Sequence, residues 1–206
     1  MVKEEQDEET LFGRIRNTVR QFFGKGVCPY EFSFTLMNPF RRFVLSPGTL
    51  VERLQLKEDF CVLELGPGPG YFSTEVAEHL TGGHLLLVDI QKEMLEKNRK
   101  RLEKHDITNA VSIQGDGSTL PIGSDKCDVA FLVAVLGEIP EPSSCIEELG
   151  RVIRDGGLLS ITEQPGDPDH IPMRTVRHLA EGQNFTFLES YGKNKNFTIN
   201  FRRGIG

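Results

Sequence analysis

The sequence lacks tryptophan, paired cysteines and long apolar runs. Its four cysteines, Cys28, Cys61, Cys127 and Cys145, lie far apart and form no CxxC pair. This spacing fits neither a metal site nor a disulfide scaffold, so we expect reduced thiols and no bound metal. No apolar run approaches the roughly 18 residues that a membrane span needs, and the N-terminus shows no secretory signal. We therefore expect a cytoplasmic protein with no membrane partner.

An excess of basic residues is also missing. The 24 Lys and Arg residues are outnumbered by 30 Asp and Glu residues, and the net charge is −6. Because the basic residues are scattered, little in the sequence would attract a polyanion, and we expect no nucleic-acid partner. Apolar residues make up 38% of the 206 positions and charged residues 26%, which is typical of a globular chain with one core.

We predict a single domain over residues 1–206. Residues 1–10 are acidic and poor in apolar side chains, which is typical of disorder. Residues from about 11 to 45 are predicted to form an N-terminal helical cap that selects the substrate, and residues from about 46 to 203 the core. The aromatic residues of the cap either line an apolar pocket or only pack a covering helix: Phe22, Phe23, Tyr30, Phe32, Phe34 and Phe40.

Short apolar segments alternate with amphipathic ones through the core. A helix is predicted to begin at Ser46-Pro47, and two alternating runs joined by Gly192–Lys195 predict a hairpin at the sheet edge. This alternation predicts an α/β fold, a doubly wound and mostly parallel sheet with helices on both faces. The predicted strands are 60–65, 84–89, 110–115, 128–135, 157–163, 185–191 and 197–203, and the further helices are 71–80, 91–104 and 143–154.

The most informative segment is a glycine-rich turn that follows the first strand. Glu64 and Leu65 lead into Gly66-Pro67-Gly68-Pro69-Gly70. Glycine lets backbone N–H groups approach a ligand closely, although a tight turn without a ligand is the alternative. The spacing departs from the dinucleotide fingerprint because the last glycine position falls on Tyr71, and the lysine of a phosphate-binding P-loop is missing.

Two further predicted strands end in a carboxylate. Asp89 lies about 20 residues beyond the glycines, where ribose hydroxyls bind in a doubly wound fold, or it caps the following helix. Asp116, within Gly115-Asp116-Gly117, either accepts a hydrogen bond from an adenine amine or forms a simple turn. Adjacent parallel strands bring their carboxyl ends to one crevice, so the three strand ends together predict one cofactor site.

In order and spacing, these segments resemble the signature regions of class I S-adenosylmethionine-dependent methyltransferases. Glu64–Gly70, Asp89 and Gly115–Gly117 are similar to the first three regions. Residues 127–140 and 149–158 are similar to the fourth strand and to the turn before the fifth, in the ubiquinone/menaquinone-biosynthesis type (methyltransferase type 11-like) branch. The chain is therefore identified as a candidate member of that branch.

The resemblance implies a Rossmann-like, seven-stranded sheet with an antiparallel last strand, and S-adenosylmethionine as the cofactor. It places the glycines under the methionine part, Glu64 near the amino group, and Asp89 on the ribose. Ile90 would lie against the adenine. The implied cofactor-binding residues are Glu64, Gly66, Pro67, Gly68, Gly70, Asp89, Ile90, Asp116, Gly117 and Val133.

Two positions depart from the family pattern. The turn before the fifth strand is Asp155-Gly156-Gly157 in place of Pro-Gly-Gly. After the fourth strand, Gly137-Glu138 stands where many relatives carry a His or Asn pair, so a histidine base there is not implied.

The predicted function is methyl transfer to a small-molecule acceptor by in-line displacement, catalysed mainly by positioning. If the acceptor arrives protonated, Glu138, Glu163 and His170 are the candidate bases, and each has a purely structural alternative. The alternative functions are a non-catalytic S-adenosylmethionine-binding or regulatory module, and a methyltransferase that acts on a protein. A monomer or a homodimer is expected.

Overall fold

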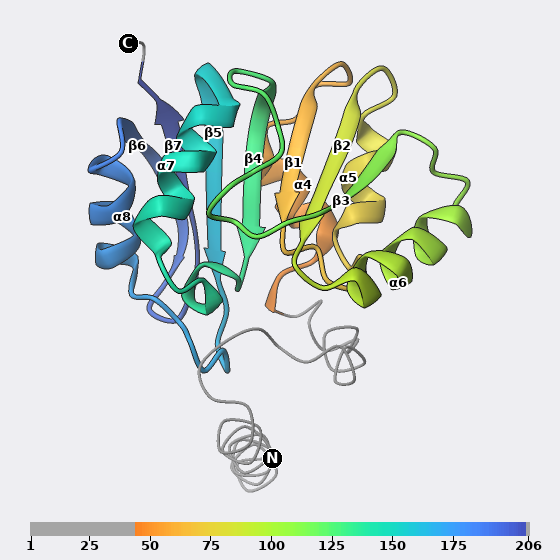
Figure 1. Ribbon diagram of the computed structural model, residues 1–206. Coiled ribbons are helices and arrows are strands. Elements are labelled where there is room, and N and C mark those ends of the chain that lie inside the picture. Colours follow the sequence, from red (N-terminus) through yellow and green to blue (C-terminus); the bar gives the residue numbers. More distant parts are fainter. Residues whose placement is uncertain (1–43, 205–206) are drawn as a thin grey trace, which may run out of the picture.

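A seven-stranded sheet forms the centre of the computed structural model, which describes residues 44–204 (Figure 1). The strand order is β3-β2-β1-β4-β5-β7-β6. The first five strands of this order are parallel, and β7 is antiparallel to both β5 and β6. The strands are β1 Cys61–Leu65, β2 His84–Asp89, β3 Ala110–Gln114, β4 Cys127–Val133, β5 Ile153–Glu163, β6 Phe185–Lys193 and β7 Asn196–Arg203.

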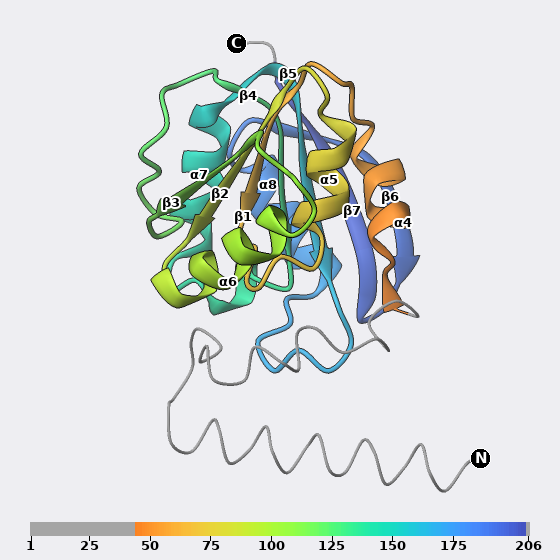
Figure 2. The same ribbon diagram turned by 90° about the vertical axis from the view of Figure 1, so that its right-hand side faces the viewer.

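Five helices of the described segment cover the two faces of this sheet (Figures 1 and 2). On one face, α4 (Pro47–Leu54), α5 (Ser73–His79) and α6 (Lys92–Glu103) bury their apolar side chains in one cluster. On the other face, α7 (Pro142–Val152) and α8 (Met173–Glu181) pack in a second cluster with the inner side chains of β7. The predicted doubly wound, mostly parallel sheet with an antiparallel last strand is confirmed.

The chain reverses its direction of winding between β1 and β4. From β1 it proceeds outward through β2 to β3, then returns to β4 on the other side of β1 and proceeds to β5. Such a switch point opens a crevice at the carboxyl ends of the two central strands. The strands beside it, β1 and β4, are buried on both faces over most of their length, as is typical of central parallel strands.

Two parts of the architecture differ from the sequence predictions. Strand β5 begins at Ile153, and the predicted turn at Asp155–Gly157 lies inside it, where Gly156 has a φ of +71°. A register irregularity between Cys127 and Val129 of β4 accommodates this extra length. Helix α8 has no counterpart among the predicted helices, although its apolar residues Met173, Val176 and Ala180 recur at helical spacing.

Predictions that fall on residues 1–43 lie outside the described residues. These are the disordered N-terminus, the helical cap with its aromatic residues, and the Cys28 thiol. The three cysteines within residues 44–204 are free thiols. No helix in this range has both the length and the apolar character of a membrane span.

The middle of β4 offers a test of the core. Phe131 is fully buried there, and truncation to Ala leaves a cavity that costs about 3–5 kcal/mol of unfolding free energy. Val111→Ala, at a half-exposed position of the edge strand β3, is expected to cost at most about 1 kcal/mol. Urea unfolding of both variants measures the difference, and equal losses would contradict the assigned core.

Candidate functional site

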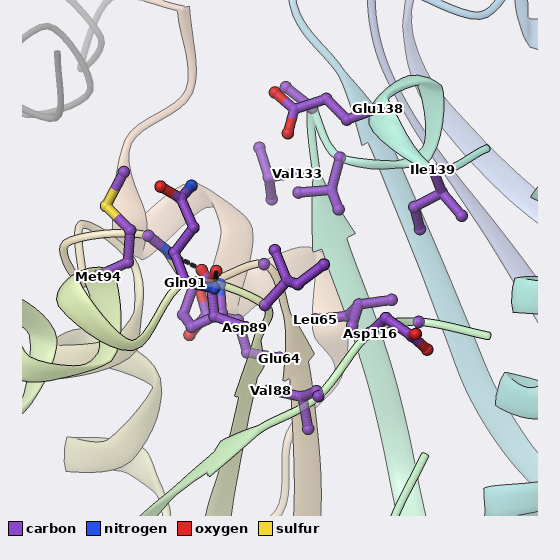
Figure 3. Close-up of a pocket in the computed structure, with 18 of the residues that line it drawn as sticks. Glu64, Leu65, Val88, Asp89, Gln91, Met94, Asp116, Val133, Glu138 and Ile139 are labelled. Carbon is purple, nitrogen blue, oxygen red and sulfur yellow. Dashed lines mark hydrogen bonds between the residues drawn. The ribbon is translucent and has the colours of Figure 1, made fainter. Parts of the chain in front are cut away.

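A cavity of about 320 Å³ lies at the carboxyl ends of β1, β2 and β4 (Figure 3). Its volume is at the lower end of the range for small-molecule sites, about 300–1,000 Å³. Most of its wall comes from residues 64–69, 88–91 and 115–118 and from the connection between β4 and α7. The cavity therefore occupies the switch point of the sheet.

The turn after β1 needs glycine for two reasons. Gly66, Gly68 and Gly70 have φ values of +68°, +54° and +87°, which side-chain-bearing residues rarely adopt. A Cβ atom on Gly66 would also lie 2.5 Å from Cγ2 of Val135, and one on Gly70 would lie 2.6 Å from Oδ1 of Asn98. Close packing against Val135 and Asn98 is therefore a reason for these glycines in addition to the close ligand approach that the sequence suggested.

Asp89 connects this turn to the end of β2. Its Oδ2 atom accepts a hydrogen bond from the N–H of Gly68 at 3.1 Å, and its Oδ1 atom accepts one from the N–H of Gln91 at 2.9 Å. Burial raises the pKa of Asp89, and the backbone hydrogen bonds oppose this shift. Helix α6 has Gln91 as its N-cap and no side-chain cap, so Asp89 does not cap this helix. Asp89 lines the cavity and keeps further acceptor capacity, and its binding of ribose hydroxyls stays a prediction.

Glu64 belongs to a buried chain of polar groups. Its Oε2 atom accepts a 2.6 Å hydrogen bond from the hydroxyl of Ser73, and the side-chain amide of Asn98 donates to that hydroxyl at 2.9 Å. The chain joins β1, α5 and α6 and orients Glu64 at the cavity wall. Sequence reasoning missed Ser73 and Asn98; the available signal was a polar residue among the apolar positions of α6.

The third predicted strand end, which follows β3, also lines the cavity. Oδ1 of Asp116 accepts hydrogen bonds from the N–H and the hydroxyl of Ser118 and from the N–H of Thr119, and these bonds lower the pKa of Asp116. The turn predicted as an alternative is therefore present. Ile90, with 50% of its surface exposed, is an apolar side chain in a cavity wall that would suit a flat ring.

The structure brings most of the predicted cofactor residues together. All of them line the cavity except Gly70, which packs against Asn98 instead. Figure 3 shows Asp89 and Glu64 side by side at the ends of β2 and β1, with Glu138 and Val133 across the cavity from them. The residues that line it are Glu64, Gly66, Pro67, Gly68, Asp89, Ile90, Asp116, Gly117 and Val133.

The three candidate bases occupy different positions. Glu138, in the short helix η2 (Leu136–Glu138), lines the cavity, whereas Glu163 and His170 do not. Glu163 ends β5 and is fully buried; burial and the negative charges of Asp167 and Glu138 raise its pKa to about 8, and the amide of Ile171 opposes the shift. His170 places its ring edge-on against Phe197.

Comparison with known proteins identifies relatives of this chain. The family described as "Methyltransferase domain" matches residues 56–186. The chain is 33% identical over 136 residues to a protein-L-isoaspartate O-methyltransferase from Bradyrhizobium sp. (strain ORS 278), covering 66% of this chain and 58% of that protein. It is 28% identical over 150 residues to a ubiquinone/menaquinone biosynthesis C-methyltransferase from Shewanella sediminis, covering 71% and 57%.

The chain thus spans little more than half the length of these two relatives. Among solved structures, it is similar to a SAM dependent methyltransferase from Aquifex aeolicus, with a TM-score of 0.79 and 20% identity. That similarity covers 86% of this chain and 100% of the other, and it establishes the shared fold.

The buried carboxyl of Glu163 makes stability depend on pH. Its pKa is about 8 in the folded protein against an ordinary value of 4.5, so between these values the folded state binds more protons than the unfolded chain. Stability contributed by the neutral carboxyl is therefore lost as the pH rises. Relative to the parent, Glu163→Gln should gain about 1 kcal/mol of unfolding free energy per pH unit between about pH 5 and 8.

Urea unfolding at a series of pH values measures this difference. Glu147→Gln is the matched control, because it makes the same change at an exposed position of α7. The difference in unfolding free energy between this control variant and the parent should stay constant with pH. If the difference between Glu163→Gln and the parent were also constant with pH, this result would contradict a raised pKa of the Glu163 carboxyl.

Proposed function

The chain belongs to the class I S-adenosylmethionine-dependent methyltransferases, and we propose that it transfers a methyl group from this cofactor to a small-molecule acceptor. The observation that carries the proposal is the cavity at the switch point. It combines the glycine turn, the Asp89 carboxylate and the connection after β4 in one wall. Those are the parts that such a cofactor and an acceptor would both have to contact.

The described residues fit the cofactor chemically. The left-handed glycine turn leaves room for backbone N–H groups beside a ligand, and Asp89 has acceptor capacity for ribose hydroxyls. The buried carboxylate of Glu64 suits an ammonium group, and the exposed face of Ile90 suits an adenine ring. These assignments of individual residues are part of the proposal.

The proposed mechanism requires little chemistry from the protein. When bound, the cofactor supplies a methyl group already activated on a sulfonium. The chain's own residues have to orient the acceptor and exclude water, and orientation alone is worth effective molarities of about 10⁵–10⁸ M. Val133 and Val135 form an apolar part of the wall, and Glu138 beside them would accept a proton from the acceptor.

A small-molecule acceptor is supported by the relatives and by the cavity. The relatives with quinone-related names include a demethylmenaquinone methyltransferase from Clavibacter sepedonicus and the Shewanella C-methyltransferase. The volume of about 320 Å³ also suits a small ligand. The second candidate is an acceptor on a protein, which is favoured by the 33% identity to the isoaspartate O-methyltransferase.

Cofactor binding is tested by calorimetric titration with S-adenosylhomocysteine. Asp89→Ala leaves ligand hydroxyls without their acceptor and should cost about 1–3 kcal/mol, a factor of about 5–150 in Kd. Glu96→Ala, at an exposed position of α6 outside the cavity, should bind like the parent. An Asp89→Ala variant that binds as tightly as the parent would contradict the ribose assignment.

Turnover is tested by incubating the full chain with S-adenosylmethionine and sets of acceptors. Mass spectrometry of S-adenosylhomocysteine should show formation that depends on a small quinol, phenol or amine. Formation only with an isoaspartyl peptide would favour the second candidate. Tight cofactor binding with no acceptor-dependent turnover would favour a non-catalytic binding module.

A further inference from the structure

A buried series of hydrogen bonds reaches the cavity wall at Glu64. The hydroxyl of Ser73 donates to Oε2 of Glu64 at 2.6 Å, and Nδ2 of Asn98 donates to Oγ of Ser73 at 2.9 Å. Ser73 and Asn98 are 0% exposed, and Glu64 is 3% exposed. Of the three residues, Glu64 alone lines the cavity. Ser73 and Asn98 therefore affect a ligand in the cavity only by acting on the residues of its wall.

The direction of these hydrogen bonds follows from the number of protons available. The Ser73 hydroxyl has one proton, which it donates to Glu64, so the other partner of its oxygen has to be a donor. The Nδ2 end of the Asn98 amide meets this requirement and keeps the hydroxyl proton directed at Glu64. The distance of 2.6 Å lies within the range of about 2.5–2.7 Å for a hydroxyl bound to an ionised carboxylate. The arrangement thus stabilises a negative charge on Glu64.

Asn98 occupies a position that an apolar residue would suit better on packing grounds. It lies on the buried side of α6 together with Met94, Leu95 and Leu102. Burying an amide is costly unless it is hydrogen-bonded, and Oδ1 of Asn98 has no hydrogen-bond partner within residues 44–204. Packing of α6 therefore does not explain an asparagine here, whereas the donor that it provides to Ser73 does.

The same amide also packs against the glycine turn. A Cβ atom on Gly70 would lie 2.6 Å from Oδ1 of Asn98 and 2.9 Å from its Cγ atom. The N–H of Gly70 donates to the carbonyl oxygen of Pro67 at 3.2 Å, which closes this turn. Asn98 thus contacts the glycine turn directly and Glu64 through Ser73. One side chain of α6 therefore holds two parts of the proposed cofactor site in a fixed relation.

A carboxylate that is held in this way favours a ligand with a positive group. Hydrogen bonds between an ammonium group and a carboxylate are roughly twice as strong as those between neutral groups. A side chain that is already oriented loses little conformational freedom when the ligand binds, whereas a freely rotating one loses more. The orientation of Glu64 should therefore increase the preference for a ligand with an amino group over the same ligand without it.

We propose that Ser73 and Asn98 are positioning residues that make the cavity selective for a ligand with an ammonium group beside Glu64. This inference rests on the proposed function, which assigns the amino group of S-adenosylmethionine to Glu64. Ser73 directs its proton at the carboxylate, and Asn98 holds both Ser73 and the glycine turn. Recognition of the amino group thus depends on two residues outside the cavity wall.

The test compares S-adenosylhomocysteine with its deamino analogue, in which hydrogen replaces the α-amino group. Calorimetric titration of the full chain gives both Kd values, and the parent should bind S-adenosylhomocysteine at least about tenfold more tightly than the analogue. Ser73→Ala removes the donor to Glu64, and Asn98→Leu keeps a branched side chain on the apolar side of α6 but removes the donor to Ser73. Each should reduce this preference by about fivefold or more, through weaker binding of S-adenosylhomocysteine.

Two matched controls make the same changes away from Glu64. Ser160→Ala removes a hydroxyl from β5 that is likewise buried and lies outside the cavity wall. Asn109→Leu removes an amide that donates to the carbonyl oxygens of Ala77 and Leu80 near the end of α5. Each control should keep the preference for S-adenosylhomocysteine within about twofold of the parent, even where the fold becomes less stable.

A purely structural role of Ser73 and Asn98 gives a different result. Ser73→Ala and Asn98→Leu would then weaken binding of both ligands equally, and the unchanged preference would overturn the positioning role. Either variant decides this point alone if the other does not fold. Equal binding of the two ligands by the parent would also overturn the proposal, because Glu64 would then not recognise the amino group. Failure of the parent to bind S-adenosylhomocysteine is a separate result, which would overturn the proposed function itself.

Discussion

The reversal of winding between β1 and β4 is the constraint on which the rest of the structure depends. Parallel strands require crossover helices, and winding outward in both directions from two central strands places these helices on both faces. The same reversal leaves the carboxyl ends of β1, β2 and β4 open to one cavity. The glycine turn, the carboxylates and the connection after β4 therefore meet there, although they lie far apart along the chain.

Polar groups at this edge are fixed by hydrogen bonds that the fold itself supplies. Asp89 accepts from the backbone of the glycine turn, and Glu64 is held by Ser73, which Asn98 supports in turn. A buried carboxylate without such donors would be costly, so these bonds both stabilise the fold and orient the cavity wall. The stability of the fold and the orientation of the cavity wall thus depend on the same contacts.

The carboxyl groups near the end of β5 interact electrostatically. Little water reaches Glu163, so its carboxyl feels the charges of Asp167 and Glu138 strongly and stays protonated near neutral pH. The backbone of Gly137 packs closely against Asp169, in the loop after β5.

The sequence alone determined the order of strands and helices, the mostly parallel sheet, the family and the three strand ends that meet at the cavity. These follow from local periodicity and from glycine and carboxylate positions next to apolar runs. Tertiary structure alone decided the early start of β5 and the support of Glu64 by Ser73 and Asn98. It alone brought the carboxyl groups of Glu163 and Glu138 near enough to interact electrostatically, because that proximity arises when separate crossovers pack, and no pattern within a short window encodes it.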